Sequence, residues 1–391
     1  MSRQRIRLPF LVWVVILSTL VACIGGTSFL GFNITGIAWV VPLFFSLLVF
    51  VAVRGRIRFP MGIWLPWAVL VVVYLSVAET PNALQRSVMI LCPIIVGMAV
   101  SKLRVDSGLL QGFDRALRLL AVGLWVVVVL KAGIHLTLRL PEITGLAAEV
   151  MTASLLATYF IASHVLGRRQ DIAWWAGLAA IPVIAMTRTG MAVAGLTYPL
   201  SFAPLRLSRR LALFGIIAVL GLALFSTERI QQKMFFSGGG TIADIRLDNP
   251  DFRTTGRTTM WDVMIPEIEK KPLLGHGTNA TEPLVSYLTG GLVHPHNDWL
   301  RLLYDYGYFG TLIFIWCLVI QVLHALARAK CSSGAEKPFF YAGASSFIVF
   351  ILFMFTDNVI LYAAFFGNLH FTFLGLAYAA HADALARGKN T

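Results

Sequence analysis

Long runs of apolar residues, separated by short polar connections, dominate the chain. A helix that crosses a bilayer needs about 20 mostly apolar residues, or roughly 17 when it is untilted. Because the runs are continuous and do not alternate, they predict helices and not a membrane β-barrel. The fold class expected from the sequence is an all-α polytopic membrane protein with about twelve transmembrane helices. The expected spans are residues 8–24, 37–53, 61–78, 87–100, 116–130, 146–166, 172–186, 191–202, 211–225, 309–326, 339–355 and 359–379.

The division between the seventh and eighth spans rests on residues 187–190 alone, and without it every later segment would reverse its orientation. The basic residues test this division. With the N-terminus inside, 20 of the 32 Lys and Arg fall on one side, four lie in short loops on the other, and eight lie in one long connection. Short cytoplasmic loops carry an excess of Lys and Arg. The distribution therefore favours the division and predicts that both termini are cytoplasmic.

The composition excludes a soluble fold. The chain has 58% hydrophobic and 13% charged residues and a mean hydropathy of +0.77, whereas soluble proteins carry about 25% charged residues. The net charge of +13 is explained by its concentration on the cytoplasmic side, so we expect membrane lipids and no nucleic acid as partners. The cysteines form no C-x-x-C pair, which gives no support for a disulfide framework or a zinc site.

Residues 226–308 form the only long hydrophilic stretch, roughly 80 residues on the non-cytoplasmic side. We expect a single transmembrane domain over 1–391, with 226–308 as a periplasmic loop that carries most of the active site. A first helix in this loop is expected after the Thr254-Thr255 pair and stops at Pro272 and Gly275; it has apolar residues at helical spacing: Met260, Trp261, Met264, Ile265 and Ile268. A second helix is expected to begin near Asn297 and to end at Gly307, where the chain re-enters the membrane.

His296 is the candidate general base. It follows Pro295, which disfavours a helical conformation for His294, and it precedes Asn297, a favourable N-cap residue. The positive end of the helix dipole disfavours imidazolium at this place, and a neutral imidazole can accept a proton. The alternative interpretation is a loop histidine that only caps a helix.

Basic side chains supply the second ingredient. Arg257 opens the first loop helix, and Arg188 lies between two apolar segments, where its charge is costly and marks a functional-site hypothesis. Arg188 could instead snorkel to the interface or pair with Glu149. Lys131, His135 and Arg139 are spaced by four and share one helical face, for which snorkelling and binding are both open interpretations.

A guanidinium group binds phosphate oxygens in a bidentate manner. With a neutral base beside it, this suits a transfer in which a hydroxyl attacks and an anionic diphosphate leaves. Gly238-Gly239-Gly240 lacks the Lys-Ser/Thr of a nucleotide-binding loop. The expected donor is therefore lipid-linked and not a nucleotide sugar.

Three short motifs follow one another in order along the chain. Together they resemble the bacterial O-antigen ligase family within the O-antigen ligase and polymerase superfamily, in which Ser is the common residue at the Thr positions beside Arg188. The matching strings are Thr187-Arg188-Thr189; Arg257 with Trp261 and then Pro272-Leu273-Leu274-Gly275-His276-Gly277; and His296-Asn297, nine residues, Gly307, two residues, Gly310. These are similar to S/T-R-S/T, R-x3-W … P-x2-G-x-G and H-[NSQ]-x9-G-x-x-G.

The resemblance implies a C-type glycosyltransferase-like fold. It also implies transfer of a polysaccharide from undecaprenyl diphosphate to a sugar hydroxyl of lipid A–core, in lipopolysaccharide biosynthesis, at the periplasmic face of the inner membrane. His296, Arg257 and Arg188 would be catalytic, in an inverting reaction without metal or other cofactor. We expect substrate binding by Asn297, His294, Gly275, Gly277, Lys131 and Arg139.

Other functions stay open at this point. O-antigen polymerases and protein O-oligosaccharyltransferases share these motifs, although one long external loop and a short C-terminal end favour the ligase. A transporter of an anionic lipid-linked glycan would use Arg188 as a charge in its pathway, but we find no pair of matching broken segments in the two halves of the chain. A structural partner in an envelope assembly would leave the pattern of His296 and Arg257 unexplained.

Overall fold

A computed structural model of the chain describes residues 8–25, 28–29, 32–138, 145–254 and 256–388. For residues 28–29, 32–35 and 388 it describes the backbone alone. The apolar runs form helices. Among the described residues there is also one antiparallel pair of two-residue strands, β1 (Ser28–Phe29) and β2 (Phe32–Asn33). The α-helices are α1 (Phe10–Ile24), α2 (Ile34–Ile37), α3 (Val40–Ala52), α4 (Met61–Leu75), α5 (Ala83–Val100), α6 (Ser107–Thr137), α7 (Ala147–Val165), α8 (Asp171–Ile184), α9 (Arg188–Leu196), α10 (Leu207–Phe225), α11 (Glu228–Met234), α12 (Arg257–Lys270), α13 (Thr281–Thr289), α14 (Asp298–Cys331), α15 (Lys337–Met354) and α16 (Asn368–Gly388).

Every expected span overlaps one of these helices, although several helices extend beyond the expected bounds. Six helical stretches among the described residues are long and apolar enough to cross a membrane, and α1, α3, α4 and α8 are shorter apolar helices. The prediction of a polytopic, helical membrane protein is confirmed, and the exact number of spans stays a prediction.

Two expected spans differ from the helices observed. The segment 191–202 is helical only to Leu196, because Pro199 cannot continue the helix and disfavours helical backbone at the residue before it. In the segment 359–379, two short turns, η2 (Val359–Leu361) and η3 (Ala363–Gly367), come before α16. The chain therefore enters the last helix through irregular backbone, and this irregular stretch reaches the candidate site.

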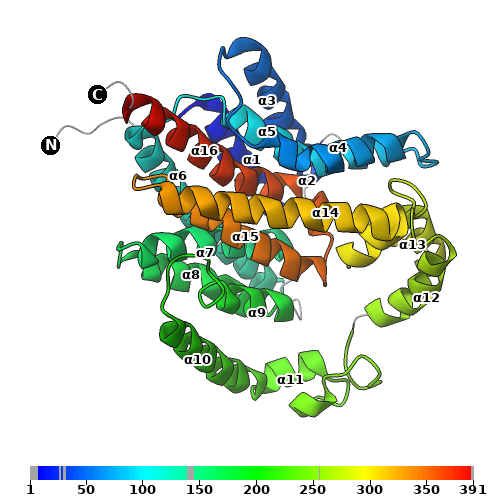
Figure 1. Ribbon diagram of the computed structural model, residues 1–391. Coiled ribbons are helices and arrows are strands. Elements are labelled where there is room, and N and C mark those ends of the chain that lie inside the picture. The colour runs from blue at the N-terminus through cyan, green and yellow to red at the C-terminus, as the bar shows by residue number, and fades with distance from the viewer. Residues whose placement is uncertain (1–7, 26–27, 30–31, 139–144, 255, 389–391) are drawn as a thin grey trace.

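The core lies among α5, α7, α15 and α16, and every residue of 363–381 is buried inside the bundle. By contrast, none of the side chains of α10, all of which are described, is buried, and α10 with α11 lies at one edge of the molecule and contacts the bundle through α9 (Figure 1). The last turn of α16 lies at the opposite end of the bundle from α12 and α13 (Figure 1). The hydrophilic segment 226–308 thus forms one end of the molecule.

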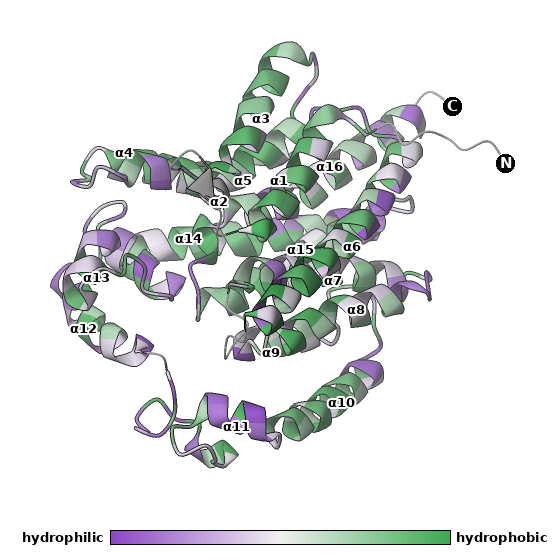
Figure 2. Ribbon diagram, turned by 180° about the vertical axis from the view of Figure 1, so that it is seen from behind, coloured by the Kyte–Doolittle hydropathy of each residue, from purple (hydrophilic) through white to green (hydrophobic). Residues whose placement is uncertain are grey.

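The segment 226–308 is folded. Hydrophilic residues gather in α11, α12 and α13 (Figure 2). The helix expected after Thr254 is α12, and its three buried residues pack against Val285 of α13 and Tyr304 of α14 in a small separate core: Met260, Met264 and Ile268. The apolar spacing predicted this face, whereas α11 and α13 were not predicted.

The expected end of the second loop helix at Gly307 is confirmed as a break within α14. Gly307 has φ 64° and ψ −172°, which separates a short arm, 298–306, from the membrane helix that follows. A Cβ atom at Gly307 would collide with the carbonyl of Leu273, so the position requires glycine for space as well as for its positive φ.

Candidate functional site

His296 lies in a strained turn that the last part of the chain holds. Its φ of +50° is in the left-handed region, which costs a non-glycine residue about 1–3 kcal/mol unless its surroundings fix it. Its backbone N–H donates to Oδ1 of Asn358 at 3.1 Å, and its ring Nδ1 lies 3.3 Å from Nδ2 of the same side chain. The imidazole, about a third exposed, is therefore held on its Nδ1 side.

Asp357 is the carboxylate beside this ring. Its Oδ1 lies 3.8 Å from Nδ1 of His296 and accepts a hydrogen bond of 2.6 Å from the hydroxyl of Tyr362. Burial acts to raise the pKa of Asp357, but the contacts with His296 and Tyr362 outweigh it and hold the pKa below its usual value. An ionised Asp357 thus faces the imidazole.

Sequence reasoning missed Asp357 and Asn358. They lie about 60 residues beyond His296, and no spacing rule connects a loop with a distant turn. The available signal was topological, because the polar pair falls in the turn between the last two expected spans, on the same side as 226–308. Asp298 secures this junction, since its Oδ2 accepts from the backbone N–H of Ile360 at 2.8 Å.

Trp261 connects α12 with the His296 turn. Its indole N–H donates to the carbonyl of Pro295 at 3.0 Å. Arg257 lies four residues earlier on α12, so it occupies the same face of the helix one turn away. The R-x3-W spacing therefore brings a guanidinium group and His296 to one place.

Arg188 is the first residue of α9, so the break expected at 187–190 falls instead at 185–187. Its Nη1 donates to the carbonyl of Arg253 at 2.9 Å, and its guanidinium lies 5.5 Å from the ring centroid of Phe252. Burial, followed by the nearby charge of Arg257, lowers the pKa of Arg188. Arg188 is thus held against Phe252 and Arg253, shortly before Arg257 opens α12, and two helix N-termini that each begin with an arginine favour an anion.

The alternative pairing of Arg188 with Glu149 is wrong, because Glu149 pairs with Lys131. The Lys131 Nζ lies 2.6 Å from Oε1 of Glu149 and donates to the carbonyls of Cys23 and Gly145 at 2.9 and 3.0 Å. These contacts tie α6 to α1 and α7, and a role for Lys131 in substrate binding stays a prediction. His135 is buried, and Arg139 lies outside the described residues.

Asn297 caps α14, as its residue type predicts. Its Oδ1 accepts from the backbone N–H groups of Trp299 and Leu300 at 3.0 and 3.2 Å. This use of the side chain explains its place in the motif, and contact with substrate stays a prediction.

His294 belongs to a buried ionic cluster. Its Nδ1 lies 2.9 Å from Nη2 of Arg301 and 3.6 Å from Oε1 of Glu282, which in turn pairs with Arg86 at the start of α5. Burial, with the charge of Arg301, lowers the pKa of His294 to about 4. A neutral His294 therefore links the loop to the helix bundle.

Gly275 and Gly277 brace the break in α14. The N–H groups of His276 and Gly277 donate to the carbonyls of Tyr304 and Asp305 at 2.9 Å, and a Cβ at Gly275 would lie 2.6 Å from the Asp305 oxygen. Both glycines have positive φ. Their observed contacts are with the protein backbone, so their predicted role in substrate binding is not tested.

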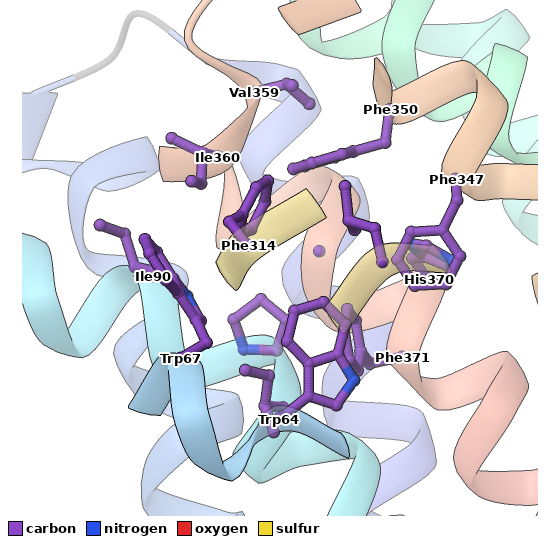
Figure 3. Close-up of a pocket in the computed structure, with 14 residues that line it drawn as sticks. Trp64, Trp67, Ile90, Phe314, Phe347, Phe350, Val359, Ile360, His370 and Phe371 are labelled. Carbon is purple, nitrogen blue, oxygen red and sulfur yellow. The ribbon is translucent and has the colours of Figure 1, made fainter. Parts of the chain in front are cut away.

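The helix bundle also contains an aromatic pocket (Figure 3), whose lining includes Val359 and Ile360, directly after Asn358. Its lining includes Trp64, Trp67, Phe314 and Phe371, and its one ionisable side chain, His370, contacts the carbonyl of Gly343 through Nε2 at 2.8 Å. Such a lining provides no group suited to diphosphate chemistry. Within the described part of the chain, no three His, Cys, Asp or Glu side chains gather as a metal site.

The candidate site thus combines two guanidinium groups, a histidine with a carboxylate beside it, and a tryptophan that joins them. Residues 172–315 match the family described as O-antigen ligase, and the matched region contains Arg188, Arg257 and His296. No curated protein matches the chain.

Proposed function

We propose that this chain, a member of the O-antigen ligase superfamily through its residues 172–315, is an O-antigen ligase. It transfers a polysaccharide from undecaprenyl diphosphate to a sugar hydroxyl of lipid A–core, at the periplasmic face of the bacterial inner membrane. The observation that carries this proposal is a pair of contacts: Arg188 donates to the carbonyl of Arg253, just before α12, and Trp261 of α12 donates to the carbonyl of Pro295 in the His296 turn.

The arginines act on the donor. Their forked N–H groups bind diphosphate oxygens and stabilise the negative charge that grows on them as the leaving group departs. Their positions at the starts of α9 and α12 add backbone N–H groups and the positive end of each helix dipole.

His296 acts on the acceptor. The acceptor oxygen attacks the anomeric carbon and forms the new C–O bond, while the bond from that carbon to the diphosphate oxygen breaks and its electron pair leaves with the diphosphate. The acceptor proton passes to His296, and direct displacement inverts the configuration. For Nε2 to accept this proton, Nδ1 must carry its own and direct it to the Asp357 carboxylate 3.8 Å away, and the amide Nδ2 of Asn358, a donor 3.3 Å from Nδ1, must then turn away from the ring.

The ligase is chosen over the polymerase on one feature of the sequence: the chain has one long hydrophilic segment, 226–308, where polymerases have two. A transporter would need an anion pathway through the bundle, whereas the arginine pair is formed by the start of α9 and the start of α12.

Reconstitution in proteoliposomes tests the proposal, with undecaprenyl diphosphate glycan and lipid A–core as the only substrates. Glycan on lipid A–core supports the ligase, and a longer glycan on the diphosphate indicates a polymerase. The absence of both products would reject both activities. His296→Ala should abolish transfer while membrane insertion stays normal, and near-normal activity would remove His296 from the chemistry. Transfer should continue in EDTA, and full inhibition would contradict the metal-independent reaction.

A further inference from the structure

A groove of about 610 Å³, open to solvent, lies beside the segments that carry Arg188 and Arg257. The proposed roles of Arg188, Arg257 and His296 do not use it. Gly256 and Thr258, on either side of Arg257, line it, as does Phe252, over whose ring Arg188 lies. Phe236 and Asp248 also line it.

Backbone hydrogen bonds hold two walls of this groove together. Phe235 and Phe252 form an antiparallel bridge, the N–H of Phe236 donates to the carbonyl of Asp251 at 2.9 Å, and the N–H of Arg253 donates to the carbonyl of Met234 at 2.8 Å. Phe235 is buried in a small core with Ile230 and Met234, whereas Phe236, in the turn that follows the bridge, is exposed.

Phe236 and Asp248 present the chemistry that a sugar requires. Phe236 is 65% exposed, with Arg253 over its ring at 4.7 Å, so much of an aromatic surface is open to the C–H face of a pyranose. The side chain of Asp248, 68% exposed, is held by a bidentate contact with Arg246. A carboxylate oriented in this way has lone pairs left to accept hydrogen bonds from sugar hydroxyls.

We propose that this groove binds the sugars of the lipid-linked donor, beyond the sugar joined to the diphosphate. This inference rests on the proposed function, which puts the diphosphate at Arg188 and Arg257. The lipid must run from there toward the membrane helices that follow Arg188, so the glycan leaves in the other direction, along the hydrophilic residues 236–259. None of the lining residues belongs to the His296 turn, which leaves a separate approach for the acceptor.

The test compares two donors in proteoliposomes, undecaprenyl diphosphate with a single sugar and undecaprenyl diphosphate with a full oligosaccharide repeat. Phe236→Ala should raise the ratio of the oligosaccharide-donor KM to the single-sugar-donor KM about fivefold, the loss expected for one stacking contact. Asp248→Asn should shift the ratio in the same direction. Tyr287→Ala is the matched control, because Tyr287 is an aromatic residue of the same segment, 87% exposed on α13.

An unchanged ratio in Phe236→Ala, or the same shift in Tyr287→Ala, would overturn the assignment. A raised KM for lipid A–core alone would give the groove to the acceptor and equally reject it. Saturation-transfer NMR with the released oligosaccharide supplies a readout that does not need transfer. Binding to the wild-type protein that is lost in Phe236→Ala supports the groove even if the wild type transfers nothing, a result that would reject only the ligase. Absence of oligosaccharide binding to the wild type would reject the groove.

Discussion

Trp261→Phe isolates the hydrogen bond that links α12 to the turn of His296. The substitution keeps an aromatic ring but removes the indole N–H that donates to the Pro295 carbonyl at 3.0 Å. Pro295 is buried, so its carbonyl is left without that donor, at a cost of about 1–2 kcal/mol. That cost falls on a turn already strained by the positive φ of His296.

The expected consequence is a loss of alignment. A change of about 1–2 kcal/mol in favour of other turn conformations lowers the ratio of competent to other conformations roughly 5- to 30-fold. The turnover number in the proteoliposome assay should fall by up to this factor, while the KM for the donor, which the arginines determine, stays within about twofold. The thermal midpoint should change little, because the small core of Met260, Met264 and Ile268 is untouched.

Trp299→Phe is the matched control. Trp299 also lies beside the turn, one residue into α14, but among the described residues its indole nitrogen has no hydrogen-bond partner. This variant should keep the wild-type turnover number. Equal activity of Trp261→Phe and wild type would refute the reasoning, as would an equal loss in the two tryptophan variants.

Three further variants test other parts of the site. Arg257→Lys keeps the charge but loses the fork, so transfer should fall about 100-fold; wild-type rates would exclude bidentate binding of diphosphate. Gly307→Ala should lower the thermal midpoint and abolish activity through the clash at the α14 break, whereas Gly221→Ala, an open position in α10, should stabilise slightly. Between pH 6.5 and about 4, His294 is protonated in the unfolded chain but stays neutral in the folded chain, so the free energy of unfolding should decrease as the pH falls through this range. If His294→Gln leaves this dependence of the unfolding free energy on pH unchanged, His294 is not its cause.

Periodicity predicted the helices well because each apolar run is long enough to need a membrane or a core around it. The same reasoning identified the start of α9 from charge distribution, and the short helix α12 from the spacing of Met260, Met264 and Ile268. It overextended the span at 191–202, where Pro199 limits the helix, and it missed the irregular turns before α16. Backbone breaks inside apolar segments leave hydropathy unchanged, so hydropathy cannot reveal them.

The candidate site was only partly predictable, for a related reason. Motif spacing identifies residues that share one helix, such as Arg257 and Trp261, because one turn separates them. The contacts of Asp357 and Asn358 with His296, and of Arg188 with Arg253, join segments about 60 residues apart. These contacts depend on how the helices pack, and the local pattern contains no record of them.

The nine residues between Asn297 and Gly307 now have a physical meaning. They form an arm of two and a half helical turns, about 13.5 Å long, fixed at both ends. At the first end Asp298 accepts from Ile360, next to the residues that hold His296. At the other, the N–H of Tyr308, directly after the break, donates to the carbonyl of Pro272 at 2.7 Å. Adding or removing one residue would turn one end by about 100° relative to the other, so both junctions could not form together. The spacing is therefore a constraint on length and rotation, which sets His296 at a fixed distance from the membrane helix.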